Sequence, residues 1–154
     1  MQCPPTRPGL NGKKFHFVEA ASKIVARSPI MYEQVWVVFD KDDFTIVNLE
    51  NVLTDNELEK SEKDHDPAYW FRSPTSFTEM LTKGSVEGVS LANNHIYDYG
   101  KQGYKDTTAA DKAAGLYYGN FGEIMYLEKQ GFKIAVICYG MWRPNGVGTV
   151  KNLI

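Results

Sequence analysis

The sequence predicts an α/β fold built from parallel βαβ units, with a β-hairpin added. Segments rich in apolar and β-branched residues alternate along the chain with segments of helical pattern, which is typical of this class. The last two apolar segments are separated by Gln130 and Gly131, a two-residue turn that indicates a hairpin. Short right-handed crossovers place successive strands side by side, so we expect strands 44–48 and 86–92 to be parallel neighbours.

Size and charge limit the classes of protein to which the chain can belong. Its 154 residues, 43% of them hydrophobic, suffice for one domain with a core. A net charge of −2 gives no basic surface for nucleic acid. No apolar run approaches the roughly 18 residues of a membrane span, and the start does not read as a signal peptide. Two cysteines, Cys3 and Cys138, leave the compartment open.

The first third of the chain predicts one helix and one strand. Residues 1–12 are rich in Pro and Gly and predict irregular chain. Residues 15–27, "FHFVEAASKIVAR", place apolar side chains on one helical face, and the Ser28-Pro29 pair ends that pattern. The segment 32–39 fits a helix or a strand equally well. Residues 44–48 contain three consecutive β-branched residues and predict a buried strand.

The remaining elements follow in alternating order. Residues 55–66 form a charged run without apolar periodicity, which predicts a solvated loop. A helix is expected over 73–84, with Ser73 as N-cap, Pro74 in the first turn and Gly84 as its end. After the strand 86–92, a further helix is expected from Gly100 to Gly115, and then the two hairpin strands around Gln130 and Gly131.

Polar side chains follow both central strands at the point where each strand ends. The stretch 89–100, "VSLANNHIYDYG", changes abruptly from apolar to polar residues, and "NLE" closes the earlier strand. Ligands of open α/β sheets usually lie at the carboxyl ends of the strands. The sequence therefore predicts a polar site at one sheet edge, formed by Asn48, Glu50, Asn93, Asn94, His95 and Asp98.

Several kinds of chemistry fit these side chains. Carboxylate and amide oxygens suit Mg²⁺, Mn²⁺ or Ca²⁺, and an imidazole admits Zn²⁺ or Fe. Alternatively, His95 acts as a general acid or base while Asp98 fixes its tautomer. In a third interpretation, the Asn side chains bind a polar ligand without metal. The structural alternatives are a simple Asn-Asn-His turn and Asp98 as a helix N-cap.

Four blocks of the chain carry a family resemblance. They are "DDFTIVNLENVLT", "FRSP", "VEGVSLANNHIYDYGKQGYKDTTAADKAAGLYYGN" and "GFKIAVICYG", within residues 42–140. In this order they resemble the bacterial capsule-synthesis protein CapA family, which looks like a branch of the calcineurin-type metallophosphoesterases. The resemblance implies that residues 1–154 form a single domain, incomplete at both ends. The implied fold is part of an α/β/β/α sandwich, and the implied role is poly-γ-glutamate synthesis, export or anchoring.

The resemblance also implies a role for four of the polar residues. Asn94 matches a metal-ligating Asn, and Glu50 stands, in a looser alignment, where a metal-binding aspartate is found. His95 matches the His that protonates a leaving group, and Asp98 would hold it as a second catalytic residue. Apart from the resemblance, Asn48 and Asn93 are expected to contact substrate, because amide side chains at strand ends can bind a polar ligand directly. The implied cofactor is a divalent metal ion: Mn, Mg, Zn or Fe.

The chain departs from the family pattern in its expected metal ligands. Neither an Asp-x-His nor a Gly-Asp block precedes Asp40, and no His follows His95. We therefore expect a fragment or a degenerate homologue that is inactive alone, although a hydrolase of the metallophosphoesterase type stays open. The alternative is a non-catalytic component that binds the polymer or supports the cell envelope.

The family resemblance implies partners and a location as well. The implied partners are poly-γ-glutamate or another anionic envelope polymer, and other capsule-synthesis membrane proteins, but no nucleic acid. The implied location is the extracellular face of the bacterial membrane or the cell surface.

Overall fold

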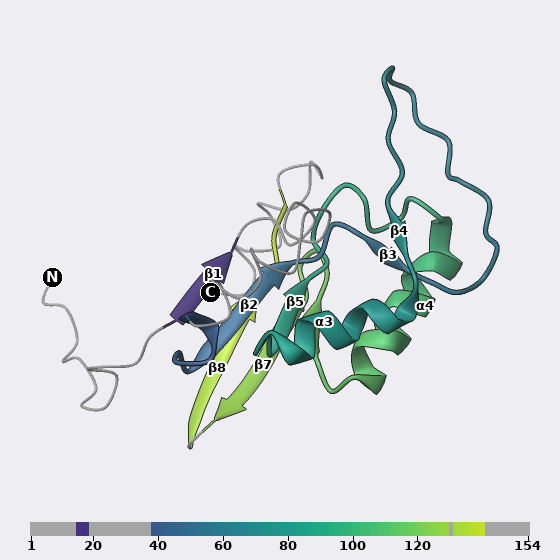
Figure 1. Cartoon of the computed structure of the whole chain (residues 1–154). Helices are drawn as coiled ribbons and strands as arrows, with labels where there is room; N and C mark the ends of the chain where they lie inside the picture. Colours follow the sequence, from purple (N-terminus) through teal and green to yellow (C-terminus); the bar gives the residue numbers. More distant parts are fainter. Residues whose placement is uncertain (1–14, 19–37, 130, 141–154) are drawn as a thin grey trace, which may run out of the picture.

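The structure is a computed structural model that describes residues 15–18, 38–129 and 131–140. Its centre is a parallel sheet with strand order β1-β2-β5-β6 (Figure 1). These strands span Phe15–Val18, Phe44–Asn48, Gly88–Ser90 and Tyr117–Gly119. The predicted α/β class with a parallel sheet is confirmed.

Strands β2 and β5 are parallel neighbours, as predicted. Val47 is aligned with Val89, and Asn48 with Ser90, so both strands end at the same edge of the sheet. β5 is shorter than the predicted 86–92, although the Leu91 amide still donates to the Gly119 carbonyl at 2.8 Å. This shared edge positions the candidate site.

The crossover from β2 to β5 holds two short strands that the sequence pattern did not predict. β3 (Val52–Leu53) and β4 (Arg72–Ser73) pair in parallel beside the main sheet. Between them runs the 55–71 loop, which projects from the body of the molecule (Figure 1). Strands of two residues are too short to leave a periodic signal.

The predicted helix over 73–84 is correct at its end and wrong at its start. Ser73 belongs to β4, and its hydroxyl accepts a 2.8 Å hydrogen bond from Asn51 Nδ2 instead of capping a helix. The turn after Pro74 is a 3-10 helix, η1 (Thr75–Phe77), followed by α3 (Thr78–Lys83), which ends at Gly84.

The second helix follows the prediction closely. α4 spans Gly100–Ala113. Gly115 follows with φ of 77°, a left-handed conformation that glycine adopts without strain.

The predicted helix over 15–27 is wrong where the structure describes it. Phe15–Val18 forms β1 and pairs with β2 in parallel, Phe15 with Phe44 and Val18 with Val47. Aromatic and β-branched residues favour strands, and pairing with a neighbouring strand overrides a local helical pattern. Residues 1–12, the rest of that predicted helix and segment 32–37 lie outside the described residues.

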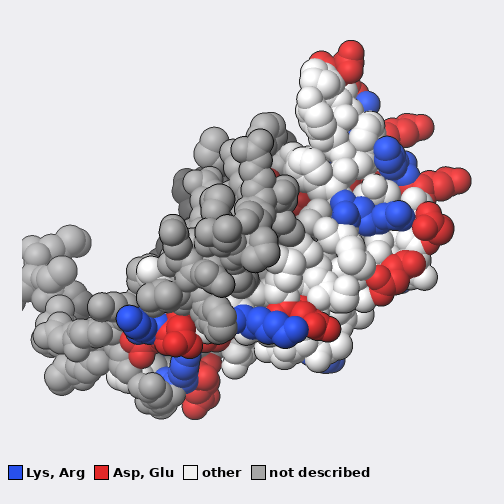
Figure 2. Space-filling model, viewed as in Figure 1, with Lys and Arg blue, Asp and Glu red and all other residues white. Residues whose placement is uncertain are grey.

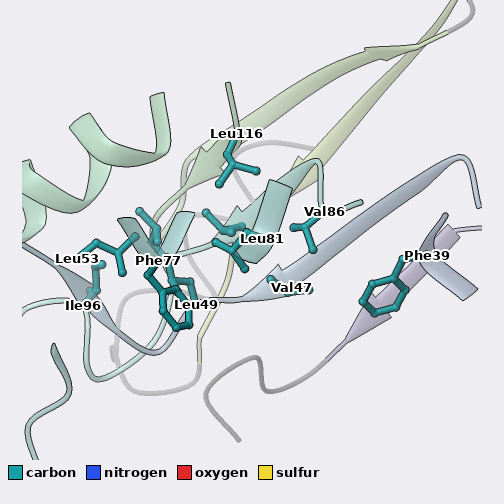
Figure 3. Close-up of a cluster of buried hydrophobic side chains, with 11 residues drawn as sticks. Phe39, Val47, Leu49, Leu53, Phe77, Leu81, Val86, Ile96 and Leu116 are labelled. Atoms are coloured by element: carbon teal, nitrogen blue, oxygen red, sulfur yellow. The ribbon is translucent and has the colours of Figure 1, made fainter. Parts of the chain in front are cut away.

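The two faces of the main sheet are covered differently. Alternate residues of β2 point to opposite faces, so Val47 enters one apolar cluster and Phe44 and Ile46 enter another. The first cluster lies against the helices (Figure 3) and includes Leu49, Leu53, Phe77, Leu81, Val86, Val89, Leu91, Ile96 and Leu116. Each such side chain contributes about 1.5–3 kcal/mol when fully buried.

The predicted hairpin covers the other face. β7 (Ile124–Lys129) and β8 (Phe132–Ile137) are antiparallel and joined across Gly131. Met125 and Leu127 are buried against Phe44 and Ile46, and Cys138 is buried with them, as expected for a small hydrophobic residue.

Candidate functional site

The ends of β2 and β5 are joined by side-chain amides. Asn93 Nδ2 donates to the Leu49 carbonyl at 2.9 Å and to Asn48 Oδ1 at 3.2 Å. Asn48 Nδ2 in turn donates to Glu50 Oε1 at 2.9 Å. The Leu49 amide also donates to the Ser90 carbonyl at 3.0 Å, so the chain stays beside β5 after β2 ends. Asn48, Glu50 and Asn93 thus lie together at one edge of the sheet, as the sequence predicts for these three residues.

Asn93 also starts the turn that carries the histidine. Its Oδ1 accepts a 2.9 Å hydrogen bond from the His95 amide, an Asx turn of the kind expected for an Asn-Asn-His stretch. Asn93 is 6% exposed. Its side chain therefore uses its donors and its acceptor to connect the strand ends and the turn.

His95 and Asp98 form a direct pair. The distance from His95 Nδ1 to Asp98 Oδ2 is 2.8 Å, and the imidazole stacks on Phe71 with ring centroids 4.2 Å apart. A proton assigned to Nδ1 leaves the Nε2 lone pair available. The His95 side chain is 12% exposed and that of Asp98 1%.

Asp98 does not act as the helix cap that the sequence alone left open. The N-cap residue of α4 is Tyr99, which makes no side-chain capping hydrogen bond. The Asp98 carboxylate instead serves the candidate site, because Oδ2 accepts from the Phe71 amide at 2.7 Å as well as facing His95. Lys63 Nζ lies 2.5 Å from the other oxygen, Oδ1.

Sequence reasoning missed the contribution of the 55–71 loop. Its charged run indicated only solvated chain, yet Lys63 and Phe71 both reach Asp98. The available signal was the aromatic run Tyr69-Trp70-Phe71 at the end of the charges, which is unusual for a fully solvated loop.

The two residues predicted to hold metal lie at the outer part of this edge. Asn94 is exposed in the turn between Asn93 and His95. Glu50 is partly buried and accepts from Asn48. The structure thus connects Glu50 to His95 through Asn48 and Asn93, with Asn94 beside that hydrogen-bonded path.

The donors present fit only part of a metal site. Within the described residues, no group of three or more His, Cys, Asp and Glu is placed to hold a metal ion. Asp98 is already engaged by His95, Phe71 and Lys63. Glu50, Asn94 and His95 Nε2 would supply about three donors, whereas full coordination takes about four to six.

Comparison with known proteins identifies the family. The sequence pattern described as "Bacterial capsule synthesis protein PGA_cap" matches residues 14–150, most of the chain. The chain belongs to this family. The resemblance found in the sequence is therefore confirmed, and capsule synthesis associates the family with the cell envelope. Across the described residues, no helix has the length and apolarity needed to cross a membrane.

Two curated relatives agree with membership in the capsule synthesis family. Both are described as a probable polyglutamine synthesis accessory protein and come from two strains of Mycobacterium tuberculosis. Each is 31% identical to this chain over an alignment of 109 positions, and the match covers 65% of this chain and 27% of the relative. The chain thus spans about a quarter of the length of these relatives.

Proposed function

We propose that this chain serves in the synthesis, export or anchoring of a poly-γ-glutamate capsule at the cell surface. Its family membership and the description of its relatives support a capsule-related role. The observation that supports the site is the His95–Asp98 pair in the turn that follows β5. Asn93 accepts from the His95 backbone amide in that turn and donates to Asn48, which in turn donates to Glu50. The partners we propose are the polymer and other capsule-synthesis membrane proteins.

The proposed architecture is part of a calcineurin-like α/β/β/α sandwich. A parallel sheet with helices over one face and a hairpin over the other is compatible with such a fold. The proposed site lies at the carboxyl ends of its strands, where open α/β sheets usually bind ligands.

The chemistry of the proposed site centres on His95. Because Nδ1 faces Asp98, the opposite nitrogen Nε2 is the atom that would accept or donate a proton whenever no cation is bound to it. Asn48 and Asn93 would fix the strand ends against which a substrate lies. Glu50 and Asn94 would help to hold a divalent cation, which when bound would polarise an oxygen of the substrate.

Paramagnetic broadening by Mn²⁺ tests this proposal. On titration of the isotope-labelled chain, we expect resonances of Glu50, Asn94 and His95 to broaden first, at millimolar rather than micromolar metal because the donor set is partial. The double variant Glu50→Ala/His95→Ala is expected to remove that local broadening. The measurement is the relaxation rate at each residue as a function of Mn²⁺ concentration.

A matched control separates the site from general acidic attraction. Glu57→Ala/His65→Ala removes the same two residue types from the 55–71 loop, where Glu57 is 94% and His65 62% exposed. This control is expected to keep the broadening at Glu50 and His95. Broadening centred on the 55–71 loop and indifferent to Glu50→Ala/His95→Ala would overturn the proposed cation site.

A second candidate function is a non-catalytic, polymer-binding or structural component. One observation favours this candidate: within the described residues, no group of three or more His, Cys, Asp and Glu is placed to hold a metal ion. However, the 55–71 loop carries six Asp and Glu against two Lys. Figure 2 shows acidic side chains on this projecting part of the molecule. That charge repels a polyanion unless a cation offsets it. Loss of any Mn²⁺ effect at Glu50 and His95 would favour this second candidate.

A further inference from the structure

We infer that Lys63 is a positioning residue for the candidate site. It fixes the Asp98 carboxylate and, through that carboxylate, the orientation of the His95 ring. The inference rests on the proposed function, because that function gives His95 its chemical role. The contacts of Asp98 with Lys63 and His95, however, are present in the chain without any metal. The inference gives a role to the 55–71 loop, whose charged sequence predicts only a solvated segment.

The first step is the electrostatic need of Asp98. Its carboxylate is 1% exposed, and an unpaired buried charge is strongly destabilising. Oδ2 is satisfied by the Phe71 amide at 2.7 Å and by His95 Nδ1 at 2.8 Å. Among the residues that the structure describes, Oδ1 accepts no hydrogen bond of regular geometry, and its close neighbour is the Lys63 ammonium at 2.5 Å. Lys63 is therefore the counter-charge of Asp98.

The second step is that the loop itself holds Lys63 in place. The Lys63 side chain is 10% exposed, and Nζ also donates to the Tyr69 carbonyl at 2.5 Å. Its ammonium lies 5.4 Å from the centroid of the Trp70 ring, and Trp70 Nε1 donates to the Ser61 carbonyl at 2.8 Å. A lysine that is free to move would not keep a fixed carboxylate geometry, but this one is bound on two sides.

The third step connects the loop to the histidine. The Ser61 amide donates to the Asp98 carbonyl at 2.8 Å, and the Phe71 amide donates to its carboxylate. Phe71 then stacks on the His95 ring. The loop and the imidazole therefore both contact Asp98. A change at Lys63 would alter the Asp98 carboxylate and affect His95 in two ways, through the direct Asp98–His95 contact and through Phe71.

Lys60 provides a matched control within the same loop. Its ammonium also lies over the Trp70 ring, 5.0 Å from the centroid, but no contact joins it to Asp98. Lys60→Met and Lys63→Met thus remove the same charge beside the same tryptophan. Only the second removes the partner of Asp98, so their difference isolates the positioning role.

The experiment measures the His95 ring nitrogens by NMR in the metal-free chain at about pH 8. In the wild type we expect a single neutral tautomer with the proton on Nδ1. Lys63→Met is expected to produce mixed tautomers and at least a tenfold faster exchange of the Phe71 amide proton. Lys60→Met is expected to change neither, and Lys63→Arg to restore the wild-type pattern because it keeps the charge.

A wild-type tautomer pattern and unchanged Phe71 exchange in Lys63→Met would overturn the inference. If Lys63→Met does not fold, Lys63→Met/Asp98→Asn removes both charges; recovery of folding in the double variant supports the pairing, and continued failure contradicts it. The result is independent of metal binding. A normal Mn²⁺ response together with an unchanged tautomer would overturn the role of Lys63 while leaving the proposed cation site intact.

Discussion

Two aspartates that are almost completely buried differ in their partners. Asp98 is held by His95, Phe71 and Lys63. Asp111, on α4, is 0% exposed, and neither of its carboxylate oxygens has a hydrogen-bond partner in the described part of the chain. Burial without a partner disfavours the charged form and raises the pKa of Asp111 to about 7. Asp98 therefore holds its partners at the candidate site, whereas Asp111 makes the stability of the fold depend on pH.

At this residue scale, Asp111→Asn is expected to change the pH dependence of folding. The folded pKa of Asp111 lies above its ordinary value of 3.8, so its stability contribution is complete below about pH 4 and is lost as pH rises through 7. Asp111→Asn should therefore change the free energy of unfolding more favourably at pH 8 than at pH 5. The difference between the two pH values should be on the order of 2–4 kcal/mol. Urea unfolding of both proteins at the two pH values measures this difference.

Asp106→Asn is the control because its shift has the opposite sign. The hydrogen bond from the Thr54 hydroxyl lowers the pKa of Asp106, so its contribution is lost only as pH falls below about 4. Its effect on stability should be the same at pH 5 and pH 8. An Asp111→Asn effect that is equally flat between those pH values would refute the assignment of a raised pKa to Asp111.

At the scale of elements, α4 lies so close to β3 that a side chain at Gly103 would not fit between them. A Cβ atom added at Gly103 would lie 2.8 Å from Val52 Cγ1 and 2.9 Å from Tyr99 Cβ. Thr107 Oγ1 accepts from the Leu53 amide at 2.9 Å and donates to the Gly103 carbonyl. This contact fixes β3, from which the 55–71 loop departs, against the helix that follows Asp98.

Gly103→Ala is consequently expected to destabilise the chain although alanine is the better helix former. The gain in helix propensity is about 1 kcal/mol. Forcing a methyl group into a closely packed contact costs about 1–3 kcal/mol, and here two neighbours stand within 3 Å, so the net effect should be a loss. Denaturant unfolding measures it, with Lys101→Ala on the exposed side of α4 as a near-neutral control. Equal or greater stability of Gly103→Ala would show that the helix can move away.

The sequence predicted those elements whose signal is local. The β-branched residues at 44–48 and the turn at Gly131 both lead to the correct strands, and the shared strand edge leads to Asn48, Glu50, Asn93 and His95. β1 was mistaken for a helix because its four residues fit both periods and pairing with β2 decides between them. Lys63 was missed because its partner Asp98 lies 35 positions further along the chain, and a charge pattern carries no information about that contact.

At the scale of the whole molecule, the proposed chemistry depends on how many metal ligands converge. Glu50, Asn94 and His95 come from one sheet edge, and the described residues add no further cluster of His, Cys, Asp and Glu. Two-metal hydrolases need bridging carboxylates and several imidazoles. Each protein ligand that is missing also removes charge that offsets the dehydration of the ion. His95 retains its partner Asp98, but a proton donor alone does not generate a nucleophile.

We therefore expect the 154-residue chain not to hydrolyse phosphoesters at a useful rate. The measurement is a chromogenic phosphodiester assay with Mn²⁺ and with Zn²⁺, run beside calorimetric titration with the same ions. Calorimetry should show weak binding or none, because about three donors are too few for a tight site. Tight stoichiometric binding, or turnover, that disappears in Glu50→Ala/His95→Ala would instead prove that a working centre closes around His95. Asp98 would not be among the added ligands in that case, since it is already engaged by Lys63, Phe71 and His95.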